Sequence, residues 1–195
     1  MKRNQIISLA ILVSITWAGC ARKTVTRINP DQQTDLSGRW NDTDSRLVAE
    51  EMTKDALGKN WRSSFVDKTG KNPIIIVGII TNKSHEHIES ETFIKDMEKE
   101  FIQSGLIRVV QNSVFREKVR EERADQQEFA AIETQKKWGK ELGADFMVFG
   151  NINSIVDAEG KRKVVYYQVN LELTNMETNE IVWIGEKKIK KYITN

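Results

Sequence analysis

The two histidines of the chain, His85 and His87, lie one residue apart within TNKSHEHIESETF, a stretch rich in carboxylates. Imidazole and carboxylate groups can bind zinc or transfer protons, and side chains at i and i+2 of an extended loop face the same way. A zinc site needs at least three protein ligands, so the histidines would have to recruit Glu86, Glu89 or Glu91. The stretch is therefore either a metal site or, as we favour, a polar loop that faces solvent or a partner. We predict no metal.

Other catalytic chemistry has little support in the sequence. The only cysteine is Cys20, and no Gly-x-Ser-x-Gly, Gly-x-x-x-x-Gly-Lys or Gly-x-Gly-x-x-Gly motif occurs. The many carboxylates lie in segments with helical composition, where a solvated charged face is a simpler interpretation than a glycosidase pair. We therefore expect a protein that is not an enzyme, needs no cofactor and takes no small-molecule substrate.

The N-terminus has the pattern of an export signal. Lys2 and Arg3 precede an apolar run over 6–17, and small residues lead to Cys20. The stretch TWAGC resembles the bacterial lipobox, which implies cleavage after a signal peptide at 1–19 and lipidation of Cys20. The alternative is an ordinary thiol or an uncleaved anchor. By the same resemblance, the absence of aspartate at Ala21 implies sorting to the outer membrane, with the folded part facing the periplasm.

Removal of the signal changes the charge balance. The chain has 30 basic and 28 acidic residues, and 1–19 contains two basic residues and no acidic one. The mature chain would therefore carry 28 of each and be formally neutral. A neutral chain lacks the basic footprint of a nucleic-acid-binding protein, so we expect no nucleic-acid partner.

The remainder divides into a tether and one domain. Residues 20–43 are polar with no apolar period, which predicts a lipidated N-terminus and flexible tether, in which Trp40 either packs back on the domain or binds a partner. Residues 44–195 are long enough for a single globular domain with a core.

Hydrophobic periodicity predicts alternating helices and strands in the domain. The expected elements are a helix from Asp44 or Ser45 to about Trp61, a buried strand at 74–80, a helix capped by Ser90 and running to about Ser104, a strand at 106–110, a helical stretch from Ser113 to about Leu142 with a break near 124–127, and strands at 145–156, 165–173 and 180–189.

This order predicts an α+β fold. We expect a mixed sheet of about five strands, ending in an antiparallel meander of three strands, with helices packed mainly on one face. Lysines crowd the last strand at 187–191, where they either prevent edge-to-edge pairing or contact anionic headgroups. The seven basic and seven acidic residues of 116–141 indicate a solvated, salt-bridged surface.

Four further segments, in order, resemble the LpoB family of lipoprotein activators of class A penicillin-binding proteins: NKSHEHIES at 82–90, FIQSG at 101–105, GADFMV at 143–148 and TNEIVWIG at 178–185. The resemblance implies a domain like the N-terminal domain of TolB. It also implies a lipid-anchored, non-enzymatic protein that binds and activates a bifunctional peptidoglycan synthase and so promotes cell-wall synthesis. The alternative is an envelope lipoprotein that is a structural or assembly partner of other outer-membrane proteins.

The resemblance also indicates where the partner would bind. The matching loop implies a partner surface that includes Asn82, Lys83, Ser84, His85 and His87, although Asn82 is equally well explained as a turn residue. Phe146 and Trp183 lie in matching segments too, but their positions on predicted strands favour the core.

Overall fold

The computed structural model describes residues 23–134 and 141–194. The chain divides into two compact units, Met1–Gln32 and Gln33–Asn195. In the first unit, the described residues contain a turn in which the Gln32 amide donates to the Asn29 carbonyl at 3.0 Å. The residues from Gln33 onward, which include the C-terminal part of the predicted tether of 20–43, belong to the second unit.

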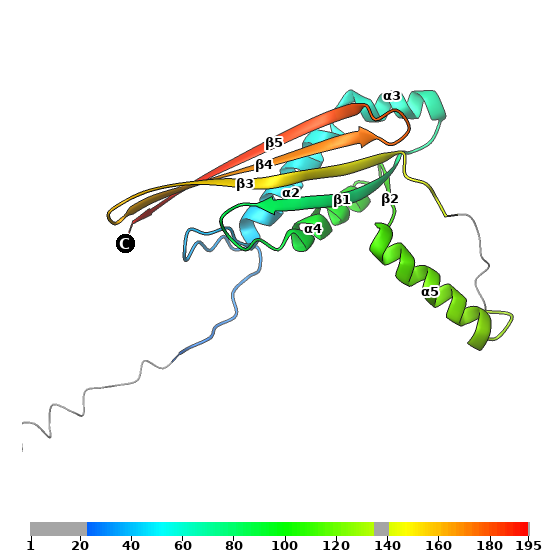
Figure 1. The fold of residues 1–195 in the computed structure, drawn as a ribbon, viewed down its shortest axis with the longest axis horizontal. Coiled ribbons are helices and arrows are strands. Elements are labelled where there is room, and N and C mark those ends of the chain that lie inside the picture. Colours follow the sequence, from blue (N-terminus) through cyan, green and yellow to red (C-terminus); the bar gives the residue numbers. More distant parts are fainter. Residues whose placement is uncertain (1–22, 135–140, 195) are drawn as a thin grey trace, which may run out of the picture. The chain divides into compact units, whose positions relative to one another are not determined.

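The second unit is an α+β domain, as predicted (Figure 1). Its elements are α2 (Asp42–Leu57), α3 (Asn60–Thr69), β1 (Ile74–Lys83), α4 (Ser90–Gln103), β2 (Arg108–Val109), α5 (Ser113–Phe129), β3 (Phe146–Glu159), β4 (Arg162–Asn175) and β5 (Ile181–Thr194).

The strands form one mixed sheet in the order β2-β1-β3-β4-β5. β1 pairs in parallel with β2 and with β3, whereas β3, β4 and β5 form the predicted antiparallel meander. α2 and α4 both lie on one face of the sheet (Figure 1). This arrangement confirms the predicted fold class. Among the described residues, no helix layer covers the other face of the meander.

The core follows the two periodicities seen in the sequence. Phe93, Met97 and Phe101 lie at i, i+4 and i+8 of α4 and are buried. In β4, every second residue from Val165 to Leu173 is buried, so this strand turns one face toward the helices. Phe146 and Trp183 also lie in the core, as expected from their strand positions.

The first predicted helix was wrong at both ends. Its N-cap is Asn41, not Asp44 or Ser45: Asn41 Oδ1 accepts the Asp44 amide at 3.1 Å, while Asp44 Oδ2 accepts the Asn41 amide at 3.0 Å. The helix ends at Leu57, and Gly58 separates it from α3. The Trp61 indole donates to the Ala56 carbonyl at 2.7 Å, which fixes the turn between the two helices.

Two other boundaries differ from the prediction. The N-cap of α4 is Glu89 rather than Ser90, and its carboxylate accepts the Glu91 amide at 3.5 Å. α5 runs without a break to Phe129, because its sequence contains no glycine or proline. It does not continue to Leu142, since residues 130–134 and 141–142 are not helical. The predicted helix over 135–140 lies outside the described residues.

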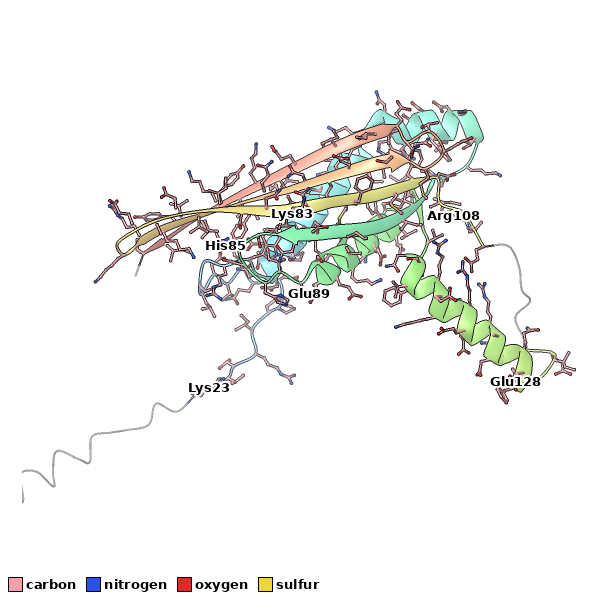
Figure 2. The ribbon with its side chains drawn as sticks, viewed as in Figure 1. Lys23, Lys83, His85, Glu89, Arg108 and Glu128 are labelled. Carbon is pink, nitrogen blue, oxygen red and sulfur yellow. The ribbon has the colours of Figure 1, made fainter. Side chains whose placement is uncertain are left out.

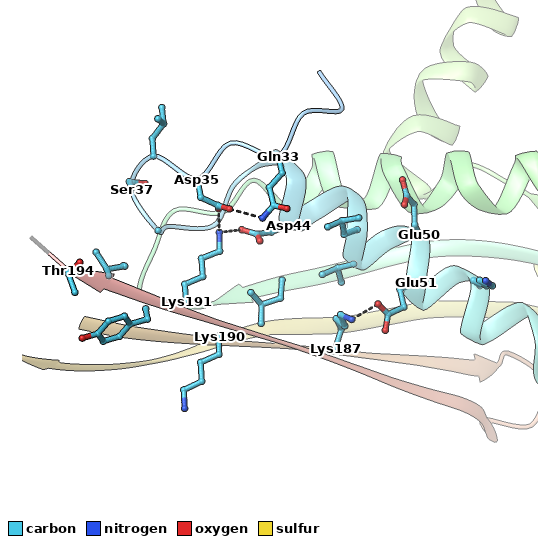
Figure 3. Close-up of a pocket in the computed structure, with 18 residues that line it drawn as sticks. Gln33, Asp35, Ser37, Asp44, Glu50, Glu51, Lys187, Lys190, Lys191 and Thr194 are labelled. Carbon is cyan, nitrogen blue, oxygen red and sulfur yellow. Dashed lines mark hydrogen bonds and ion pairs between the residues drawn. The ribbon is translucent and has the colours of Figure 1, made fainter. Parts of the chain in front are cut away.

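The segment 33–41 is held against α2 and β5 by Lys191. The Lys191 ammonium donates to Asp44 at 2.6 Å and to Asp35 at 2.9 Å (Figure 3). It also donates to the Arg39 carbonyl at 3.0 Å. Burial alone would lower the pKa of Lys191, but the bonds to the two carboxylates raise it. A hollow of about 990 Å³ lies between the segment, α2 and β5.

The attachment of this segment should weaken in acid. Hydrogen bonds from Gln33, Lys191 and Asn41 lower the pKa of Asp35 from 3.8 to about 2. Because the pKa in the folded state is below the ordinary value, the Asp35 carboxylate stabilises the fold above pH 3.8, and this contribution is lost as the pH falls through about 2.

Asp35→Asn should therefore lower the free energy of unfolding by about 0.5–1 kcal/mol near neutral pH, the size of a partly exposed ion pair. Urea denaturation of wild type and Asp35→Asn across this pH range measures the difference. We expect it to vanish as the pH falls to about 2. A difference that does not change with pH would contradict the assigned role of the carboxylate.

Candidate functional site

The loop that follows β1 is organised by Asn82. The Asn82 side-chain amide donates to the Glu86 carbonyl at 2.8 Å and to the Ile88 carbonyl at 3.5 Å. Its Oδ1 accepts the Ser84 amide at 2.9 Å and the Ser84 hydroxyl at 2.7 Å. Asn82 is thus the turn residue that the sequence allowed, and its polar atoms are used inside the loop.

The strand register explains why Asn82 and Lys83 differ. Asn82 lies opposite Ile152, which is buried in the core, whereas Lys83 lies opposite Asn153 on the other face of the sheet. Successive side chains of a strand point to opposite faces, so only one of these two neighbours can be presented to solvent. Lys83 is exposed and Asn82 is half-buried.

The two histidines are exposed. The Ser154 hydroxyl on β3 accepts the His85 amide at 3.0 Å and lies 2.6 Å from His85 Nδ1, which orients the ring. His85 and Lys83 lie at the C-terminal end of β1, at the opposite end of the strand from Arg108 (Figure 2). The loop therefore brings all five predicted residues together, but presents only Lys83, His85 and His87 as exposed side chains.

Glu86 joins the loop to the segment 33–41. Its side chain is 9% exposed. One oxygen accepts the Trp40 amide at 3.0 Å, and the other lies 3.3 Å from His85 Nε2. Burial, and next the nearby Glu86 carboxylate, raise the pKa of Tyr167. The Glu86 carboxylate thus links the loop to the segment 33–41. The sequence suggested Glu86 only as a metal ligand.

Trp40 completes this support. Its ring packs edge-on against Tyr167 with the centroids 5.4 Å apart, and its indole donates to the Ser45 hydroxyl at 2.7 Å. The prediction that Trp40 packs back on the domain is confirmed. Sequence reasoning missed the link between Trp40 and Glu86, because these residues are 46 positions apart and no local pattern connects them.

Within the described part of the chain, no group of three or more His, Cys, Asp or Glu side chains is placed to hold a metal ion. No helix between 23 and 134 or between 141 and 194 is long and apolar enough to cross a membrane. The loop presents cationic and imidazole groups on a rigid support, an arrangement suited to contact with another macromolecule.

Several charged side chains on β5 and α5 are paired with carboxylates. β5 is an edge strand, as predicted, and its lysines contact carboxylates: Lys187 binds Glu51, and Lys188 lies 2.5 Å from Glu186. On α5, Arg120 binds both oxygens of Glu141 at 2.9 Å, which confirms the salt-bridged surface. We therefore regard the loop at 82–89 as the candidate site.

Removing the Asn82 side chain should loosen this loop. Asn82→Ala loses the hydrogen bonds to Ser84, Glu86 and Ile88, which we expect to cost about 1–2 kcal/mol of unfolding free energy. Hydrogen exchange measured by mass spectrometry should become faster at 84–88. Asn82→Asp keeps the hydrogen-bond acceptor but loses the donors, so its exchange rates at 84–88 should lie between those of the wild type and Asn82→Ala. Equal exchange rates in wild type and Asn82→Ala would disprove the organising role.

Comparison with known proteins identifies the family. Residues 44–189 match the family model described as "Peptidoglycan-synthase activator LpoB". No curated protein sequence matches the chain.

Among solved structures, the LpoB C-terminal domain from Escherichia coli is 13% identical, with 76% of this chain and 99% of that chain covered and a TM-score of 0.44. The same domain from Salmonella enterica is 12% identical, with the same coverage and a TM-score of 0.41. The PelC dodecamer from Paraburkholderia phytofirmans is 14% identical, with 62% and 72% covered and a TM-score of 0.36. On the family-model match, which spans most of the chain, this protein belongs to the LpoB family.

Proposed function

We propose that this protein is a lipid-anchored periplasmic regulator that binds and activates a bifunctional peptidoglycan synthase, a class A penicillin-binding protein. The observation that carries the proposal is the match of 44–189 to a family of peptidoglycan-synthase activators. The lipobox-like sequence at Cys20 supports attachment to the outer membrane. In this role the chain performs no reaction and acts only by changing the activity of its partner.

The loop after β1 is the proposed contact with the synthase. Lys83, His85 and His87 are its exposed cationic and imidazole groups, while Asn82 and Glu86 hold the backbone in place. A loop that is already ordered loses less conformational entropy on binding than a flexible one. Of the five residues predicted for the partner surface, three are therefore proposed as contact residues. The other two, Asn82 and Ser84, shape the loop.

The anchor limits where the partner can be. Because the compact unit begins at Gln33, the segment from Cys20 spans about a dozen residues and reaches about 45 Å when fully extended. The loop after β1 can therefore lie no farther from the anchoring membrane than this length plus the distance across the domain from Gln33 to the loop, and the synthase must present its contact domain within that range.

Affinity capture from an envelope extract tests this proposal. The bait is the chain from Ala21 onward, which contains the whole compact unit. We expect mass spectrometry to find a penicillin-binding protein with the wild-type bait and much less of it with a Lys83→Ala, His85→Ala, His87→Ala variant. The matched control is Lys68→Ala, Lys71→Ala, which removes exposed cations that precede β1, away from the loop.

The result also separates the alternative role. Recovery of outer-membrane assembly proteins alone, with no penicillin-binding protein, would exclude synthase activation and favour a structural partner of the envelope. Equal recovery of the synthase with the loop variant and with the wild type would keep the partner but exclude the loop as its contact.

A further inference from the structure

The outer edge of β1 is open for most of its length. β2 pairs only with Ile74 and Ile75, and its last bond to β1 is the one that the Val110 amide donates to the Ile75 carbonyl at 3.0 Å. Among the described residues, no strand pairs with this edge from Ile76 to Lys83. Because backbone groups alternate in direction along a strand, the next pair to face outward is that of Val77. Such an edge can accept another strand.

A groove of about 600 Å³ follows this edge. β1 contributes its floor, while α4 and the first turns of α5 contribute its walls. Half of the lining side chains are apolar: Ile76, Ile79, Ile80, Ile94, Val114, Phe115 and Met147. The groove therefore offers apolar contacts on both sides of a line of backbone donors and acceptors.

Two of these apolar residues are unusually exposed. A bulge in β1 between Val77 and Ile80 places two residues of β1 opposite Phe149 and leaves Ile79 77% exposed. Val114, on the wall that α5 contributes, is 64% exposed. An occupant that covered both side chains would bury apolar surface that now faces water, and this burial would favour binding.

The charges along the groove favour an acidic occupant. Lys95, Arg116 and Lys118 line the groove, against one acidic residue, Glu91. Lys95 is partly neutralised by Glu98 at 2.7 Å. Lys118 has no carboxylate within ion-pair distance among the described residues, and its ammonium lies 5.5 Å from the centre of the Phe115 ring.

From these observations we propose that the edge of β1 is a second binding site, which takes an extended peptide segment with alternating apolar residues and at least one carboxylate. The segment adds a strand to β1 through backbone hydrogen bonds, its apolar side chains cover Ile79 and Val114, and its carboxylate pairs with Lys118. The groove is not lined by Lys83, His85 or His87, and peptide binding there does not depend on the identity of the synthase.

Selection from a phage-displayed library of random dodecapeptides tests the proposal, with the chain from Ala21 onward as the immobilised target. We expect enriched peptides to alternate apolar residues and to contain aspartate or glutamate. A labelled enriched peptide should bind in fluorescence anisotropy, and it should slow hydrogen exchange of the Val77 amide.

Variants at the edge provide the controls. Ile79→Lys and Val114→Asp should each weaken peptide binding by about tenfold or more, as expected for a side chain central to an interface. Lys118→Glu should weaken binding of acidic peptides in particular. Ile184→Lys changes another exposed apolar strand residue, on β5, and should leave binding unchanged. Because Ile79, Val114 and Ile184 are all exposed, the melting temperature of each variant should stay close to that of the wild type.

The contrary results are equally specific. Failure to enrich any peptide, or enriched peptides that bind Ile79→Lys and Val114→Asp as well as wild type, would overturn the proposal. Self-association in analytical ultracentrifugation that is lost on Ile79→Lys would assign the edge to a second copy of the chain instead. Peptide binding without capture of a synthase would contradict the proposed function while leaving the β1 site intact.

Discussion

Gly150→Ala should be among the most destabilising single substitutions in this domain. A β-carbon at Gly150 would lie 2.0 Å from the Asn170 carbonyl oxygen and 2.9 Å from Leu171 Cδ2. The first of these atoms belongs to the backbone of β4 at the centre of the meander, so it cannot move without breaking the β3–β4 pairing. Since overpacking usually costs 1–3 kcal/mol, we expect a loss of about 3 kcal/mol or more of unfolding free energy.

Urea denaturation of the chain from Ala21 onward measures this effect. The matched control is Gly143→Ala, because a β-carbon there would meet no atom within 4 Å. The control should change the unfolding free energy by less than about 1 kcal/mol. A Gly150→Ala variant as stable as this control would show that the β3–β4 spacing is wider than the structure indicates.

Cys20→Ser should have the largest effect on where the protein resides. If Cys20 carries two or three acyl chains, each buried methylene contributes about 0.8 kcal/mol to membrane attachment, so loss of the thiol removes the anchor. We expect complete loss of radioactive palmitate from the protein and retention of the uncleaved precursor. Because Cys20 is the only cysteine, no other thiol can take its place.

Metabolic labelling followed by membrane fractionation measures both outcomes. Ala21→Ser is the control, and it should keep the label and appear in the same membrane fraction as the wild type. Palmitate incorporation into Cys20→Ser, or a wild-type protein without label, would contradict lipidation at this position.

The elements of the core could be predicted because they depend on local spacing. Val48, Met52 and Ala56 repeat every four residues, and all three are buried on α2. The boundaries failed where a distant contact decides the end of an element. Trp61 belongs to a second helix and packs edge-on against Phe146 at 5.1 Å, and no local pattern shows that α3 must begin there.

The position of the loop that we propose as the site could be predicted from the sequence, but its internal arrangement could not. The polar stretch after the buried strand correctly indicated a loop at the end of β1. The different environments of Asn82 and Lys83 depend on the register of β1 with β3, and the support from Glu86 depends on Trp40 in a segment predicted to be a tether. Both features depend on contacts between residues that are far apart in the sequence, and such contacts cannot be predicted from local residue types and spacing.

The most direct test of the proposed function is the rate at which a class A penicillin-binding protein from the same organism polymerises glycan chains from lipid II. Addition of the chain from Ala21 onward should raise this rate several-fold, and the Lys83→Ala, His85→Ala, His87→Ala variant should not. The Lys68→Ala, Lys71→Ala variant should act like the wild type. An unchanged rate at saturating wild-type protein would contradict the account that this domain is a synthase activator.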